Sequence, residues 1–166
     1  MNAAPITSLP IATNAGTFTA HYSMQGLCAL DFPPAGKGTP RRPIPPVGNI
    51  HAWHQLTTEA VANILVGRTP RELPPLDLSV GTDFQRRVWE EMTWTPCGET
   101  RSYAEIAQAI GRPKAVRAVG GACGANPIPL LIPCHRVLAA GGKLGGFSGG
   151  LEWKRKLLAI EGIVMC

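Results

Sequence analysis

The stretch SYAEIAQAIGRPKAVRAVGGACG, residues 102–124, contains the clearest local signals for structure in the chain. Ser102 and Glu105 have the spacing of a capping box, which predicts a helix start, and Gly111 is suited to end that helix. Pro113 is suited to the first position of a second helix. Two short helices joined by a turn at residues 111–113 have helix-turn-helix spacing, although any tight helical corner has the same spacing.

The second of these helices is rich in small residues, which are Ala115, Ala118, Gly120, Gly121, Ala122 and Gly124. Glycine inside a helix costs roughly 1 kcal/mol relative to alanine, so a compensating contact is expected. Close packing of two helices would supply one, and so would close approach to a nucleic-acid backbone. Lys114 and Arg117 would contact nucleic acid in the second case and would be solvated surface residues in the first.

Helices are also predicted on both sides of this stretch. Thr82 and Gln85 form another capping box at the start of residues 82–92. Residues 151–162 predict a final helix with Leu151, Leu158 and Ile160 inward and the basic residues 154–156 outward. The glycine-rich segment 141–150 before it predicts a flexible surface loop or a mobile wall over a pocket.

The stretch IPCHRV, residues 132–137, places a cysteine beside a histidine after a proline-rich apolar run. The prolines predict a semi-extended segment that holds Cys134 fixed, and most buried cysteines are inert. A nearby base would make the thiol a nucleophile. Adjacent side chains of an extended segment point to opposite sides, so His135 would act through a water or after a bend of the backbone. Glu161 is the candidate that orients His135, and Arg136 would supply positive potential or a structural salt bridge.

The first half of the chain has a different composition. Residues 15–32 predict a hairpin with a turn at Gln25-Gly26, residues 33–48 a Pro/Gly-rich loop, and residues 51–67 a helix. Residues 68–81 are extended and contain three prolines, so we place a domain boundary there. The expected units are an α/β domain at 1–80 and a mostly helical domain at 81–166 that contains the candidate DNA-binding and catalytic residues.

Composition limits the classes of protein that fit. The chain has 166 residues, 45% of them hydrophobic, and a net charge of +5 whose excess lies in the second half, which is compatible with nucleic-acid binding. Five cysteines, an odd number with no C-x-x-C, disfavour a disulfide framework and a zinc ribbon and favour a reducing compartment. The first fifteen residues contain no Lys or Arg, which disfavours a secretory signal, and no apolar run approaches the ~20 residues of a membrane span. We therefore expect a cytoplasmic protein, associated with the nucleoid in a prokaryote, and no membrane partner.

Taken together, several segments resemble the O6-alkylguanine-DNA alkyltransferase family in order and spacing over about half the chain. They are DFQRRVW, PCGETRSYAEIA, AVRAVGGACGANPIPLLIPCHRV, GGFSGG and LLAIEG, between residues 82 and 162. The resemblance implies an α/β (α+β) fold with an RNase H-like sheet and helix, followed by a winged-helix-like helical domain. It also implies one irreversible alkyl transfer per molecule from O6-alkylguanine, and from O4-alkylthymine, in double-stranded DNA.

The resemblance also assigns roles to residues. Cys134 would accept the alkyl group, His135 would deprotonate it through a water, Glu161 would orient His135, and Asn126 would form a hinge. The helix-turn-helix would enter the minor groove, with Arg117 replacing the flipped base and Tyr103 pressing on the phosphate and donating to N3 of the guanine. The remaining assignments are Ala118, Gly121, Ser102 and Lys114 for DNA contact, and Tyr103, Val137, Ser148, Gly149 and Pro129 for the substrate pocket. No cofactor or metal is expected, and the protein would be a monomer that could bind DNA cooperatively.

Two other classes of function stay open at this point. A DNA-binding protein that flags alkylated bases for another pathway would bind the lesion without changing its own mass. A cysteine hydrolase would turn over repeatedly and would not need Arg117.

Overall fold

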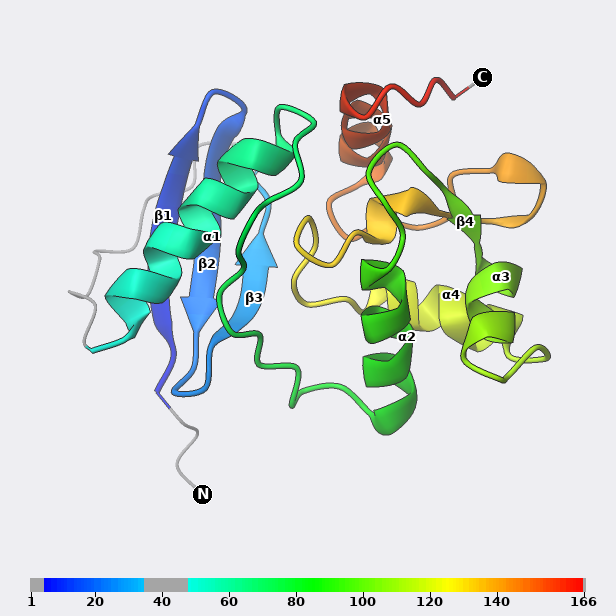
Figure 1. The fold of residues 1–166 in the computed structure, drawn as a ribbon, viewed down its shortest axis with the longest axis horizontal. Helices are drawn as coiled ribbons and strands as arrows, with labels where there is room; N and C mark the ends of the chain where they lie inside the picture. The colour runs from blue at the N-terminus through cyan, green and yellow to red at the C-terminus, as the bar shows by residue number, and fades with distance from the viewer. Residues whose placement is uncertain (1–4, 35–47, 166) are drawn as a thin grey trace.

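The computed structural model describes residues 5–34 and 48–165, and confirms the expected α/β class. A three-stranded antiparallel sheet comes first, with strands β1 (Thr7–Thr13), β2 (Gly16–Tyr22) and β3 (Leu27–Asp31) in the order β1-β2-β3. The helix α1 (Ile50–Ile64) crosses one face of this sheet, and the remaining helices form a second body beside it (Figure 1). Most of the loop expected at 33–48 lies outside the described residues.

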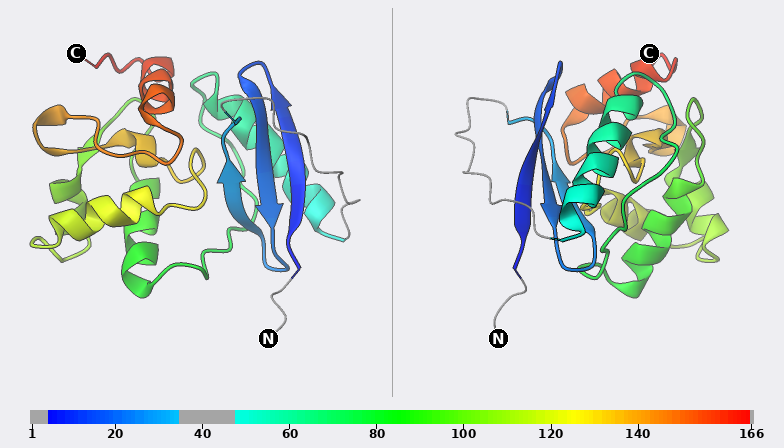
Figure 2. Two further views of the ribbon diagram at one scale, coloured as in Figure 1. Left: turned by 180° about the vertical axis from the view of Figure 1, so that it is seen from behind. Right: turned by 60° about the vertical axis from the view of Figure 1, so that its left-hand side comes forward.

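The sheet contains the predicted hairpin and one more strand. β2 and β3 form the hairpin, with Gln25 and Gly26 in its turn, and β1 adds an edge strand that the sequence reasoning did not find. Leu9, Ile11 and Phe18 point toward the core, since alternate residues of a strand share a face. Seen from behind and from the side, α1 lies against only one face of the sheet (Figure 2).

The edge of β3 that does not pair with β2 is hydrogen-bonded to two segments that are distant in the sequence. Leu27 exchanges hydrogen bonds with the extended linker, through Pro75 O at 2.8 Å and the amide of Asp77 at 2.8 Å. Leu30 donates its amide to Pro127 O at 2.9 Å, which joins the sheet to the segment that precedes the candidate cysteine. The sheet edge therefore supports the candidate site.

The second body confirms both capping boxes. The helices α2 (Asp83–Thr93) and α3 (Tyr103–Ala109) begin after Thr82 and Ser102, whose side chains accept from the amides of Gln85 and Glu105. The helix α4 (Val116–Gly124) packs against both helices. The short strands β4 (Arg101–Ser102) and β5 (Val137–Leu138) pair in parallel.

The expected start of α4 is wrong by three residues. Pro113 lies in the turn, and α4 begins at Val116 after Ala115. The amide of Ala115 donates to Arg112 O at 2.8 Å, and this bond closes a separate turn before the helix begins.

The final helix α5 (Leu151–Ile160) is rotated relative to our expectation. Lys154, predicted to point outward, is 0% exposed, whereas Leu151, predicted to point inward, is 43% exposed. The buried stripe consists of Lys154, Leu157 and Leu158, which have i, i+3, i+4 spacing. Ile160 is only half-buried. Among the described residues, no helix is long and apolar enough to cross a membrane.

Candidate active site and DNA-contact helix

Cys134 lies in a turn and not in the semi-extended segment that the prolines predicted. Residues Cys134–Arg136 form one turn of 3-10 helix, and the side chain of Cys134 is 3% exposed. The chain reverses just before this turn, where Leu130 has the left-handed φ of 74° and Pro129 pairs with Ile132. Because of this bend, the side chains of Cys134 and His135 do not take the opposite directions that adjacent side chains of a strand have.

Asn126 holds this reversal closed. Its Nδ2 donates to Ile132 O at 2.9 Å, and its Oδ1 accepts from the amide of Ile128 at 3.0 Å. The buried amide thus bridges the two ends of the apolar loop that leads to Cys134. This is the position between α4 and the cysteine at which the family resemblance implied a hinge.

His135 is fully buried and bonded to Glu161, as predicted. Its Nε2 lies 2.8 Å from Glu161 Oε1. Glu161 is ionised and has no proton to give, so Nε2 carries the hydrogen and donates it. Nδ1 then has a free lone pair, and it has no hydrogen-bond partner among the described residues. Burial lowers the pKa of His135, which keeps the ring neutral and makes Nδ1 a base.

Glu161 is held ionised by four donor groups, one of which is His135 Nε2. Arg136 donates from Nε at 3.0 Å and 3.1 Å and from Nη2 at 2.8 Å, and the amide of Gly98 donates at 3.1 Å. Although burial opposes ionisation, the bonds from His135 and Arg136 lower the pKa of Glu161 to about 2. Of the two roles considered for Arg136, the structure contains the salt bridge.

The Cys134 thiol is protonated at neutral pH in this arrangement. Burial raises its pKa to about 11, while the hydrogen bond from Asn126 and the charge of Lys154 act in the opposite direction. The free Nδ1 of His135 shows that no direct bond joins the two side chains in the described part of the chain. In this geometry the thiol therefore has no direct hydrogen-bonded path for its proton to His135 Nδ1.

Tyr103 lies between α4 and the glycine-rich loop. A Cβ at Gly120 would come within 3.3 Å of its ring, and a Cβ at Gly145 would meet its hydroxyl oxygen. Gly120 is therefore small in order to accommodate Tyr103, which the sequence did not indicate. Nothing lies within 4 Å of a Cβ built at Gly121, so this glycine keeps the outer surface of α4 open.

The candidate DNA-contact residues occupy one exposed region. Arg117, Ala118 and Gly121 are exposed on α4, and Lys114 is exposed in the turn before it. Ser102 is half-buried and its hydroxyl is used as the cap of α3. The structure therefore brings together the basic and small residues that the sequence selected, with Ser102 committed to the fold.

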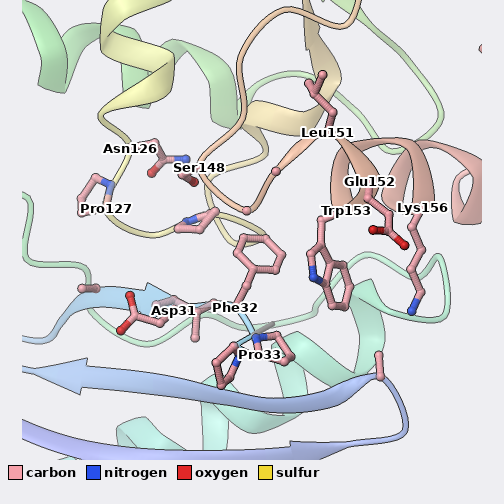
Figure 3. Close-up of a pocket in the computed structure, with 17 residues that line it drawn as sticks. Asp31, Phe32, Pro33, Asn126, Pro127, Ser148, Leu151, Glu152, Trp153 and Lys156 are labelled. Carbon is pink, nitrogen blue, oxygen red and sulfur yellow. The ribbon is translucent and has the colours of Figure 1, made fainter. Parts of the chain in front are cut away.

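The candidate pocket residues divide between two places. Pro129, Ser148 and Gly149 line a groove of about 830 Å³ that also reaches Asn126, whereas Val137 is fully buried and does not line this groove. Figure 3 shows Asn126 and Ser148 at one part of this groove and Phe32 and Trp153 further along it. The two aromatic rings pack at 5.1 Å between centroids, and sequence reasoning missed them because they come from β3's end and α5.

No metal site is evident in residues 5–34 and 48–165. Within these ranges no group of three or more His, Cys, Asp or Glu side chains could hold an ion. Cys28, Cys97, Cys123 and Cys134 are free thiols.

Comparison with known proteins gives consistent matches. The family model described as 6-O-methylguanine DNA methyltransferase, DNA binding domain, matches residues 83–163. A methylated-DNA–protein-cysteine methyltransferase of Mycolicibacterium paratuberculosis is 55% identical over 93 residues, which are 54% of this chain and 56% of that protein. The bifunctional transcriptional activator/DNA repair enzyme Ada of Escherichia coli is 47% identical over 109 residues, which are 66% of this chain and 30% of that protein.

These matches span about half the length, or less, of the curated relatives. A solved structure extends the likeness to the first half of the chain. The crystal structure of Mycobacterium tuberculosis OGT in complex with DNA has a TM-score of 0.73 and 36% identity, and the match covers 95% of this chain and 92% of that one. With that identity over nearly the whole of both chains, this chain belongs to the O6-alkylguanine-DNA alkyltransferase family.

Proposed function

We propose that this protein repairs alkylated DNA by moving the alkyl group of O6-alkylguanine in duplex DNA onto its own Cys134. The observation that carries the proposal is the free, buried Nδ1 of His135, whose other nitrogen is bonded to the ionised Glu161. This pair is a base with a fixed tautomer beside a buried thiol. In this proposal the two expected units have different roles. Residues 81–166 bind DNA and carry out the reaction, and residues 1–80 support the site structurally.

The reaction is an in-line displacement at the alkyl carbon. A water carries the Cys134 proton to His135 Nδ1, and Glu161 stabilises the imidazolium that forms. The sulfur then forms a bond to the alkyl carbon as the bond from that carbon to O6 breaks, and the electron pair leaves on the guanine. The product is a thioether with no route back to a thiol, so each molecule reacts once.

Tyr103 has the position to assist the leaving base. Its hydroxyl lies beside Gly145, and burial raises the pKa of this phenol, with further contributions from the charges of Cys123 and then Cys134. A protonated phenol near the reacting sulfur can donate to N3 of guanine as negative charge develops there. We favour this role over pressure on the phosphate.

The outer surface of α4 provides the contact with DNA. Small residues there permit close approach of the helix to a minor groove, and the exposed side chain of Lys114 would contact a phosphate. Arg117 would fill the space of the extruded base, since extrusion costs a few kcal/mol and least for a poorly paired base. O4-alkylthymine offers a similar alkyl-oxygen bond on a smaller ring and is the second substrate. The protein would act as a monomer in the cytoplasm.

Intact mass tests the transfer itself. Incubation with a duplex that contains O6-methylguanine should add one methyl group per molecule, and Cys134→Ala should abolish the gain. Cys123→Ala is the matched control, because Cys123 is also a buried free thiol, and it should keep the gain. Folded protein that binds the duplex and gains no mass would instead be a lesion-flagging protein, and repeated turnover would indicate a hydrolase.

A second experiment tests the role of Arg117. Arg117→Ala should slow transfer from duplex DNA far more than transfer from free O6-benzylguanine, because the free base needs no extrusion. Arg155→Ala, an exposed change on α5, should affect neither reaction. Equal losses of both reactions in Arg117→Ala would refute a role in base extrusion.

A further inference from the structure

Lys154 is a buried ammonium surrounded by backbone carbonyls. Its side chain is 0% exposed, and Nζ donates to Val137 O at 2.7 Å, to Gly146 O at 3.4 Å and to Leu144 O. Lysine is almost never fully buried unless it is paired. The carbonyls solvate the ammonium but carry no net charge, so they do not neutralise it.

No carboxylate is paired with Lys154 in the described part of the chain. The ion pairs there are His21–Asp31, Arg86–Asp83, Arg101–Glu91 and the contacts of Glu161 with His135 and Arg136. The negative charge of the Glu161 carboxylate and the positive charge of the Arg136 guanidinium cancel each other. The site is left with one buried positive charge, that of Lys154, when the cysteine is protonated.

Cys134 is the group that can supply the balancing charge. The carbonyl that Lys154 contacts at 2.7 Å belongs to Val137, three residues after Cys134, and α5 packs against the turn that carries the thiol. Burial lowers the pKa of the Lys154 ammonium and raises that of the Cys134 thiol, and the charge of each side chain opposes the effect of burial on the other. The thiol and the ammonium therefore form a latent ion pair.

The other titratable groups around the thiol are poorer partners for Lys154. Cys123 faces the site from α4, but burial raises its pKa to about 12, above the value of about 11 for Cys134. Burial also raises the pKa of the Tyr103 phenol, which faces the site from α3. His135 is neutral, and Glu161 is bonded to Arg136. Of the two thiols, Cys134 has the lower pKa, and it lies in the turn that immediately precedes the Val137 carbonyl bound by Lys154.

We propose that Lys154 is the buried counter-cation of the Cys134 thiolate and is a positioning residue for alkyl transfer. The same ammonium holds the carbonyls of Leu144 and Gly146, so charge compensation and the shape of the glycine-rich loop depend on one group. The inference deepens the proposed function, since it concerns the nucleophile of that reaction. Transfer of an alkyl group converts the thiolate into a neutral thioether and leaves Lys154 without its counter-charge.

The test is alkylation of Cys134 by iodoacetamide as a function of pH, with the modified cysteine identified by peptide mass. The thiolate forms a bond to the reagent's carbon, and iodide leaves with the electron pair. Lys154→Met should react about tenfold or more slowly below the thiol pKa, which corresponds to an upward shift of one unit, and the deficit should shrink as pH rises. Lys154→Arg keeps the charge and should react faster than Lys154→Met. Arg155→Met, an exposed change on the same helix, should match the parent protein.

A second measurement needs no change at Lys154. The Lys154 ammonium, followed by its side-chain NMR resonance in the parent protein, should lose its proton before the thiol ionises, and over that pH range the alkylation rate of the parent should approach that of Lys154→Met. A Lys154→Met protein whose deficit is the same at every pH, and so does not follow the titration of Lys154, would overturn the proposal. Both measurements use no DNA and no alkylguanine, so a failed methyl transfer would leave their results unaffected.

Discussion

Replacement of Glu161 by glutamine should remove the charge on which the candidate site is built. The carboxylate of Glu161 is 2% exposed and accepts bonds from His135, Arg136 and Gly98. The Glu161→Gln change keeps the size of the side chain. It leaves the guanidinium of Arg136 without a counter-charge and turns an amide donor toward groups that are themselves donors.

The pKa of Glu161 gives the size of the effect. In the folded protein it is about 2, against a usual value of 4.5, so ionisation of this group favours the folded state. At pH 7 this difference corresponds to about 3 kcal/mol. A lowered pKa stabilises at pH values above 4.5, and the stabilisation is lost as pH falls toward 2; at pH 3 about 1 kcal/mol should remain. Loss of one partner of a buried ion pair costs roughly 3–5 kcal/mol, which agrees.

Urea unfolding of both proteins at pH 7 and pH 3 measures this quantity. The free energy of unfolding of Glu161→Gln should be lower by about 3 kcal/mol at pH 7, and the gap should narrow to about 1 kcal/mol at pH 3. Glu90→Gln is the matched control, since Glu90 is exposed on α2, and should change stability by less than about 0.5 kcal/mol. A gap below about 1 kcal/mol at pH 7, or one that does not depend on pH, would refute the account.

Three further changes test neighbouring parts of the site. Gly145→Ala should destabilise the protein by more than about 1 kcal/mol in thermal unfolding, because Gly145 has φ of 67° and the added methyl would meet Tyr103. The control is Gly146→Ala, which should be nearly neutral because nothing lies within 4 Å of a Cβ built at Gly146. Gly121→Ala should raise helix stability by up to about 1 kcal/mol, yet weaken DNA binding in a fluorescence anisotropy titration because it fills the open surface of α4. Asn126→Ala should lower the free energy of unfolding by about 2 kcal/mol or more, since it leaves a buried carbonyl and a buried amide without partners. An Asn126→Ala protein with unchanged stability would show that the loop before Cys134 keeps its conformation without the hydrogen bonds of Asn126.

Helix starts could be predicted because their signals are local. A capping box needs only the side chains at its two positions, so Thr82 and Ser102 were sufficient to place α2 and α3. β1 was missed because Pro10 lies in the middle of it. Proline is tolerated there since β1 is an edge strand, and the order of strands cannot be read from a short segment.

The orientation of Lys154 could not be predicted because its environment is made by distant residues. Three consecutive basic residues usually indicate a solvated helix face, and that reading holds for Arg155 and Lys156. The carbonyls that surround Lys154 belong to residues 137, 144 and 146, which approach only after the loop has turned. A prediction from hydrophobic periodicity alone therefore gave α5 the wrong rotation about its axis and placed Leu151 inward.

The burial of Cys134 connects the geometry of the site to the selectivity of the proposed reaction. A thiol with a pKa of about 11 is almost entirely protonated at neutral pH, so it reacts slowly with electrophiles that it meets by chance. In the proposed reaction each molecule reacts once, so such protection would preserve the acceptor until a substrate arrives. Activation then requires both a water path to His135 Nδ1 and a nearby positive charge, and the structure contains the base and the ammonium of Lys154. In this scheme, selectivity depends on proton transfer from Cys134 to His135 as well as on the shape of the substrate pocket. Changes at His135 or Lys154 should therefore alter the pH dependence of transfer more than the affinity for DNA.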